Sequence, residues 1–151
     1  MLISCGCEEQ MQQPGQSGYP AVEVQKTCLF APAKIKFNQL TEVKDSGQII
    51  AYIDMLDEFG SRIKDSGVWR FELYEYVPRS TESRGARVYI WPEITLIDAK
   101  VNYNLWQDYL RCYKFDLNLD IDIVGDKSYI LQAVCFTAQG KRLSDWITLK
   151  M

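Results

Sequence analysis

The chain has 151 residues, of which 47% are hydrophobic and 25% are charged, a composition typical of one globular domain with a substantial core. Its net charge is −3, and its 17 Lys and Arg are scattered among 20 Asp and Glu, which argues against nucleic acid as a partner. It has no histidine, so it lacks the commonest general base and metal ligand, and we expect no enzymatic activity, no metal site and no cofactor.

The chain begins MLISCGC, in which two aliphatic residues and a serine precede Cys5. This pattern resembles the lipobox of bacterial lipoproteins, which implies that Cys5 is lipidated and anchors the protein to a membrane of the cell envelope. Gly6 stands where Asp signals inner-membrane retention in enteric bacteria, so the resemblance implies a periplasmic or outer-membrane-associated protein. The basic and apolar regions that precede a lipobox are absent, and an upstream start of the reading frame would supply them. The alternative is a chance match in a cytoplasmic protein.

Residues 8–21, EEQMQQPGQSGYPA, have too few large apolar side chains to offset the entropy lost on ordering. We therefore predict a truncated signal with lipobox and a flexible tether over residues 1–21, and one folded domain over residues 22–151. The chain has five cysteines, and lipid on Cys5 leaves an even number. The cysteines in or beside apolar segments are predicted to be buried as small hydrophobic side chains: Cys28, Cys112 and Cys135.

Within residues 22–151, apolar residues recur at every second position, which is typical of β-strands with one buried face. In VWRFELY, Trp69, Phe71 and Leu73 share one face. The longest alternation is YKFDLNLDIDI, over residues 113–123, and it predicts a long strand with an acidic outer face. Further strands are predicted over residues 33–39, 48–56, 62–64, 87–91, 94–98, 128–137 and 143–149. No apolar run reaches the ~20 residues of a membrane-spanning helix.

Turn residues separate these strands. KDSG occurs at residues 44–47 and 64–67, each time before a strand, and Gln139 and Gly140 predict a hairpin between the last two strands. A helical repeat breaks the alternation near residues 102–111, where we predict one short helix with Asn102 or Asn104 as its cap. The helical repeat consists of Leu105, Trp106, Tyr109, Leu110 and Tyr113.

Eight or nine strands and one short helix predict an all-β fold, a sandwich of two antiparallel sheets. Residues 126–149 resemble the last two strands of an immunoglobulin-like or fibronectin-type sandwich, with Tyr129 placed as a tyrosine corner and Leu131 and Ala133 facing inward. Residues 48–64 resemble a strand pair of transthyretin-like or carboxypeptidase-regulatory sandwiches. Leu131 stands where the second cysteine of an immunoglobulin disulfide would be. The resemblance therefore implies this architecture without that disulfide.

The motifs that resemble catalytic or metal sites are incomplete. Asp116, Asn118 and Asp120 are spaced like the first ligands of a calcium loop, but the required Gly and Glu are missing, so a solvated strand face is the better interpretation. Weak divalent-cation binding by this acidic row is the alternative. Residues 61–64 match the S-x-x-K of penicillin-binding enzymes, but the accompanying S-D-N and K-T-G are absent.

Aromatic residues next to a polar loop are the remaining candidates. Loop residues 78–85, PRSTESRG, are the most polar internal segment. Exposed aromatic and arginine side chains there predict a face that binds a protein or glycan partner, and the candidates are Tyr74, Tyr76, Tyr89, Arg79 and Arg84. The leading hypothesis is a non-catalytic lipoprotein of the cell envelope that acts as an accessory or adhesive binding module. The alternatives are a soluble structural subunit of a larger assembly and, third, a carboxylate-dependent hydrolase.

Overall fold

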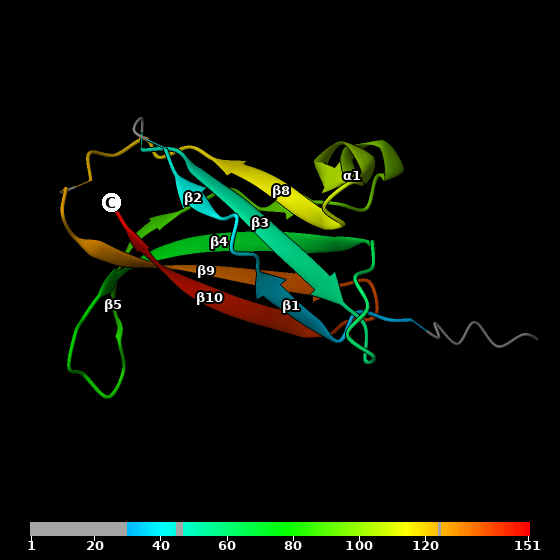
Figure 1. The fold of residues 1–151 in the computed structure, drawn as a ribbon, viewed down its shortest axis with the longest axis horizontal. Helices are drawn as coiled ribbons and strands as arrows, with labels where there is room; N and C mark the ends of the chain where they lie inside the picture. The colour runs from blue at the N-terminus through cyan, green and yellow to red at the C-terminus, as the bar shows by residue number, and fades with distance from the viewer. Residues whose placement is uncertain (1–29, 45–46, 124) are drawn as a thin grey trace, which may run out of the picture.

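The computed structural model describes residues 30–44, 47–123 and 125–151 (Figure 1). These residues form two five-stranded sheets and one short helix, and every strand pairing is antiparallel. The predicted all-β sandwich is confirmed. The described residues contain ten strands rather than eight or nine, because the two-residue strands Glu42–Val43 and Trp106–Gln107 were not predicted. The strand predicted over residues 62–64 is wrong, since Arg62 makes only an isolated bridge with Leu56. Cys5, Cys28 and the predicted tether lie outside the described residues.

The first sheet has the strand order β1-β3-β8-β7, with β2 also paired to β3. Strand β8 pairs with one edge of β3, so both β1 and β2 pair with the other edge of β3. Its strands are β1 (Lys34–Phe37), β2 (Glu42–Val43), β3 (Ile49–Leu56), β7 (Trp106–Gln107) and β8 (Cys112–Leu117).

The second sheet has the order β10-β9-β4-β5, with β6 also paired to β4. Gln139 and Gly140 lie in the hairpin between β9 and β10, as predicted, and Gly140 has a φ of 81°. This left-handed backbone is the reason that a glycine is suited there. The strands are β4 (Gly67–Tyr76), β5 (Arg84–Ile90), β6 (Ile94–Thr95), β9 (Ser128–Thr137) and β10 (Arg142–Lys150).

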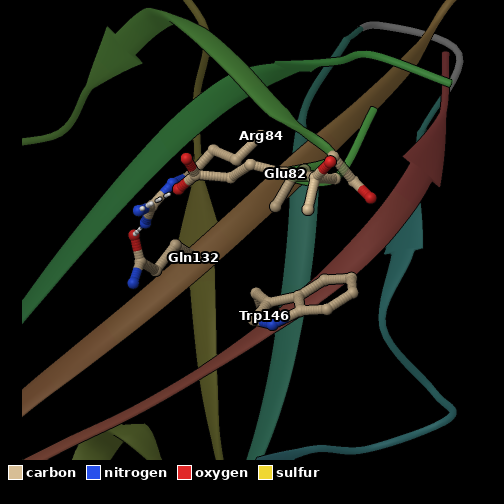
Figure 2. Close-up of a pocket in the computed structure, with 7 residues that line it drawn as sticks. Glu82, Arg84, Gln132 and Trp146 are labelled. Carbon is tan, nitrogen blue, oxygen red and sulfur yellow. Dashed lines mark hydrogen bonds and ion pairs between the residues drawn. The ribbon is translucent and has the colours of Figure 1, made fainter. Parts of the chain in front are cut away.

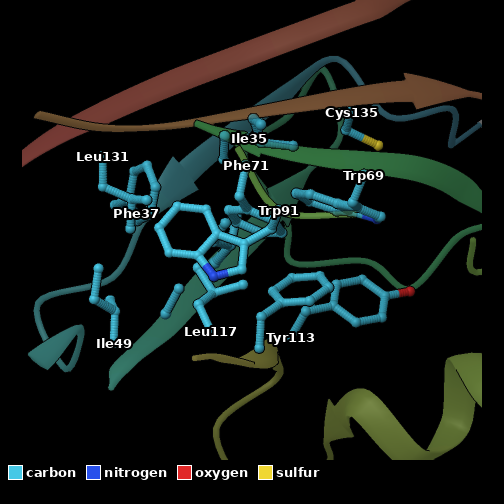
Figure 3. Packing of buried hydrophobic residues seen from close by; sticks show 14 of the residues in the cluster. Ile35, Phe37, Ile49, Trp69, Phe71, Trp91, Tyr113, Leu117, Leu131 and Cys135 are labelled. Carbon is cyan, nitrogen blue, oxygen red and sulfur yellow. The ribbon is translucent and has the colours of Figure 1, made fainter. Parts of the chain in front are cut away.

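The core lies between the two sheets and is rich in aromatic rings (Figure 3). Trp69 and Phe71 of β4 meet Phe115 of β8 with ring centroids 5.0 and 4.9 Å apart. Leu131 and Ala133 of β9 are fully buried beside them, as the alternation predicted. Burial of such side chains contributes roughly 1.5–3 kcal/mol each to the stability of the domain.

Cys112 and Cys135 are buried and carry free thiols, which confirms the prediction for these two cysteines. Burial raises the pKa of both, and that of Cys135 reaches about 12. They pack as small hydrophobic side chains and stay protonated at neutral pH.

The predicted strand over residues 113–123 is too long, because β8 ends at Leu117. Leu117 pairs with Ile49, the first residue of β3, and in the part of the chain that the structure describes no strand continues beyond that point to pair with the following residues. Instead, the backbone carbonyl of Asn118 accepts a hydrogen bond from the indole of Trp91 at 2.6 Å. An alternating sequence forms a strand only where a neighbour can satisfy its backbone groups.

The predicted helix near residues 102–111 is displaced toward the N-terminus, since α1 is Ala99–Leu105. Its cap is Asp98, whose side chain accepts hydrogen bonds from the backbone nitrogens of Lys100 and Val101, both at 3.0 Å. Trp106 is already extended and pairs with β8. The helix therefore ends at the start of the helical repeat that begins with Leu105, because the next residues pair with β8. No helix of the described residues is long and apolar enough to cross a membrane.

The two ends of the sandwich differ (Figure 1). One end, here named the α1 end, holds α1, the turn after β3 and the β9–β10 hairpin. Phe30, the first described residue, lines a groove at this end with Arg62 and Trp106. The hairpin between β4 and β5, here named the β4–β5 hairpin, projects at the opposite end. The start of the described chain and the polar loop over residues 78–85 are thus separated by the length of the sheets.

Candidate functional site

The outer face of the second sheet carries several of the predicted binding residues. Tyr74 and Tyr76 of β4 point away from the core, because they alternate with Phe71 and Leu73. Tyr76 pairs with Arg84 at the start of β5. The structure therefore places three of the five predicted residues on one face.

A pocket of about 320 Å3 opens between this face and the β4–β5 hairpin (Figure 2). Strands β9 and β10 form its floor and the hairpin forms its wall. The indole of Trp146, on β10, is 57% exposed, which is unusual for a residue of this size. The residues that line the pocket are Thr81, Glu82, Ser83, Arg84, Ile130, Gln132 and Trp146.

Arg84 is the best-connected side chain of the pocket. One guanidinium nitrogen donates to the side-chain oxygen of Gln132 at 2.9 Å, and another lies 3.5 Å from the carboxylate of Glu82. The same guanidinium stacks over the ring of Tyr74, 5.0 Å from its centroid. These contacts hold Arg84 against the sheet and orient Gln132, so the polar groups of the pocket are ordered before any ligand binds.

Beneath the guanidinium, Tyr74 donates a hydrogen bond to Glu72, whose carboxylate lies 3.6 Å from the guanidinium of Arg87. Burial raises the pKa of Tyr74, and the hydrogen bond to Glu72 raises it further. The phenol therefore stays protonated at neutral pH and supports Arg84 as a neutral ring.

The two other predicted residues lie elsewhere. Arg79 is at the tip of the β4–β5 hairpin, where it has a φ of 63°, and it does not line the pocket. Tyr89 lies on the inward side of β5, packs edge-on against Trp91 at 4.9 Å and donates to Asp120 at 3.2 Å. Tyr89 pairs with the inward-facing Leu73, and the register between β4 and β5 shifts between this pair and Tyr74. Tyr89 is therefore part of the packing between the sheets.

Sequence reasoning missed Gln132 and Trp146. Leu143, Ile147 and Leu149 face the core, so the alternation of β10 already places Trp146 on the opposite face. Gln132 pairs directly with Trp146 and is likewise out of phase with Leu131. The alternation in β9 and β10 therefore indicated that both side chains face outward. Only the tertiary structure shows that β9 and β10 lie beneath the β4–β5 hairpin.

The incomplete motifs do not converge on a reactive group. Lys64 lies over the rings of Tyr103 and Trp106, 5.3 and 5.5 Å from their centroids, while the backbone nitrogen of Ser61 donates to Asp57 at 2.8 Å. In the acidic row, the side-chain oxygen of Asn118 accepts from Gln48 at 2.7 Å. Among the described residues, no three His, Cys, Asp or Glu side chains form a group that could hold a metal ion.

Comparison of the chain with known protein families, with curated proteins and with solved structures finds no match. The resemblance to immunoglobulin-like and transthyretin-like sandwiches, and to bacterial lipoproteins, therefore stays a prediction from the sequence.

Proposed function

We propose that this protein is a non-catalytic binding module of the bacterial cell envelope, anchored through lipid on Cys5, and that its pocket takes a carbohydrate. The observation that carries the binding assignment is the exposed indole of Trp146 opposite the ordered polar groups of Arg84 and Gln132. An exposed aromatic beside preorganised polar groups is a common composition for a recognition site.

The chemistry of the pocket matches that of a sugar ring. A pyranose has one face of C–H groups, which stacks on an indole, and a rim of hydroxyls that both donate and accept hydrogen bonds. Trp146 offers the flat apolar surface, Arg84 offers donors, and Glu82 and Gln132 offer acceptors. The volume of about 320 Å3 is near the lower limit of small-molecule sites, roughly 300–1,000 Å3, and suits a terminal sugar unit.

The pKa shifts of two cysteine thiols and two tyrosine phenols support a non-catalytic role. Burial is the largest cause that raises the pKa of the thiols of Cys112 and Cys135 and of the phenols of Tyr74 and Tyr113. A nucleophile or general base near neutral pH needs the opposite shift. The absence of histidine from the whole chain points the same way.

The arrangement of the molecule supports the anchor. The described chain begins with Phe30 at the α1 end, and the β4–β5 hairpin lies at the other end (Figure 1). An anchor that precedes Phe30 would attach at the end opposite the hairpin, so the hairpin and its pocket would stay unobstructed and accessible to a soluble or surface-bound glycan.

The test of the pocket is an array of defined oligosaccharides, followed by titration of each one retained. We expect Trp146→Ala to weaken binding by about tenfold or more, because the stacking surface is lost. The matched control is Phe136→Ala, which removes another exposed aromatic from the outer face of the same sheet, away from the pocket. An array on which the native protein binds nothing, or equal binding by the Trp146→Ala variant, would contradict the assignment.

The anchor is tested separately by palmitate labelling of cells that express the full upstream reading frame. We expect label on the native chain and none on a Cys5→Ala variant. Label on neither chain would remove the anchor and leave the pocket proposal standing.

A further inference from the structure

The most exposed large apolar side chains of the described residues gather at one end of the molecule. All five lie at the α1 end: one precedes β1, one is in the turn after β3, and three lie in the stretch between β6 and β8. They are Tyr109 (97% exposed), Phe59 (79%), Ile97 (68%), Phe30 (61%) and Tyr103 (61%). Single exposed apolar residues are ordinary, but a concentration at one end marks an interaction surface.

Ordered backbone presents these side chains. Asp57 accepts hydrogen bonds from the backbone nitrogens of Phe59 and Ser61, at 2.9 and 2.8 Å, and so holds the turn that carries Phe59. The buried amide of Asn102 donates to the carbonyls of Asp65 and Leu96, at 2.9 and 3.0 Å. Helix α1 and the segment before it are thereby tied to the sandwich, and Tyr103 and Ile97 with them.

Basic side chains lie among these apolar groups. Lys64 lies over the rings of Tyr103 and Trp106, and it lines two adjacent grooves of about 470 and 380 Å3. Arg62 and Arg111 line the larger groove, with Phe30 at its side. Acidic groups are also present at this end. Asp54 lies 3.2 Å from the guanidinium of Arg62, and the loops at this end carry Asp57, Glu58, Asp65, Asp98 and Asp108. The surface is therefore amphipathic, without a strong positive field.

This combination fits the interface of a lipid bilayer. Tyr and Trp side chains concentrate at the headgroup level, because their rings are apolar and their tips polar, and Lys and Arg keep their charge in water while their stems lie in apolar surroundings. We propose that the α1 end docks onto the membrane that holds the anchor and places Tyr109, Phe59 and Tyr103 among the lipid headgroups. The orientation of the protein on its membrane rests on the proposed lipidation of Cys5.

The length of chain ahead of the domain favours this occupant. Phe30 follows Cys5 by 25 residues, which span at most about 90 Å when fully extended. Since Phe30 lines a groove at the α1 end, a lipid on Cys5 would hold that end within this distance of the bilayer. No comparable attachment holds a second copy of the chain or a protein partner near the α1 end.

The test uses the full chain carrying Cys5→Ala, so that binding reports the α1 end without a covalent lipid. The protein is floated with vesicles of phosphatidylethanolamine and phosphatidylglycerol. We expect it to float, and the double variant Phe59→Ser with Tyr109→Ser to lose about tenfold or more in apparent affinity, because each ring leaves the interface. Both side chains are at least 79% exposed, so these substitutions leave the fold intact.

The matched control is Tyr76→Ser with Val77→Ser, which removes two exposed apolar side chains from the β4–β5 hairpin, at the opposite end of the sandwich. We expect its flotation to equal that of the parent. Absence of flotation by the parent, equal flotation of the two double variants, or a dimer that the α1-end substitutions dissociate would each overturn the proposal. Flotation of the parent together with unlabelled Cys5 in cells would retain the docking surface and reject the anchor.

Discussion

Asn102 shows how much one buried polar residue organises in this protein. Its amide nitrogen donates to two backbone carbonyls, and its amide oxygen lies 2.9 Å from the hydroxyl of Tyr113. That hydroxyl also lies 2.8 Å from the carbonyl of Asp65 and accepts from the Asp65 nitrogen at 3.1 Å. One amide and one phenol thus join α1, the segment before β4 and β8. Buried groups in such a network are costly to leave unpaired.

Replacing Asn102 by Ala should therefore lower the free energy of unfolding by about 2–3 kcal/mol, because two buried carbonyls lose their donor. Tyr113→Phe should cost about 1–2 kcal/mol, since it removes the hydroxyl and leaves the ring in the core. Urea denaturation measures both. The two losses should not add in the double variant, because each residue pairs with the other. Additive losses would show that the network is not a unit.

Two buried residues also predict how stability depends on pH. Burial raises the pKa of Cys135 from 9.0 to about 12 and, as the largest cause, that of Tyr113 from 10.0 to about 12. Both groups are neutral when protonated, so the folded state favours the protonated form. Their contribution is fully present below about pH 9 and is lost as the pH rises toward about 12.

Each group should lower the free energy of unfolding by about 1.4 kcal/mol per pH unit across its interval. Urea denaturation between about pH 8 and 11 measures this slope. In a Cys135→Ala variant the alkaline slope should be shallower from about pH 9, whatever the overall loss from the smaller side chain. An unchanged slope would assign the alkaline loss to other groups.

At the scale of elements, the first strand depends on a side chain from the other sheet. The backbone nitrogen of Phe37, on β1, donates to the carboxylate of Asp145, on β10, at 2.8 Å. Asp145 points inward between Leu143 and Ile147, so a carboxylate closes the seam between the edges of the two sheets. An edge strand otherwise has one row of unpaired backbone groups.

Asp145→Ala should lower the free energy of unfolding by about 1.5–3 kcal/mol, the range for a hydrogen bond to a charged group. Hydrogen exchange of the Phe37 amide should accelerate more than that of amides in the centre of β3, because the change frees the β1 edge first. Asp145→Asn, which keeps an acceptor, should restore part of the protection. Equal protection of the Phe37 amide in all three proteins would refute a role in the seam.

The elements also show where sequence patterns reach their limit. The alternation in β4, β9 and β10 predicted these strands closely, because each has a neighbour along most of its length. The same alternation after Leu117 predicted a strand that does not form, since Leu117 already pairs with the first residue of β3. The helical repeat near Trp106 failed for a related reason, because backbone pairing with β8 outweighs local propensity.

At the scale of the whole molecule, the two proposed surfaces lie apart, so they should act independently. Trp146→Ala should weaken oligosaccharide binding by about tenfold or more and leave vesicle flotation unchanged, while Phe59→Ser with Tyr109→Ser should weaken flotation and leave oligosaccharide binding unchanged. Additivity is expected because the two sets of residues share no contacts. Flotation and titration of both variants test this, and a loss of both activities in either variant would indicate one shared surface or a disturbed fold.

The sequence by itself determined the local features: the inward phase of Trp69 and Leu131, the Gly140 hairpin, the burial of Cys112 and Cys135, and the all-β class. These depend on alternation and turn chemistry, which a short segment contains in full. Tertiary structure alone decided where β8 and α1 end, that Tyr89 packs inward, and that Trp146 and Gln132 meet Arg84 beneath the hairpin. Those outcomes depend on which strand lies next to which, and no residue carries that information in its own segment.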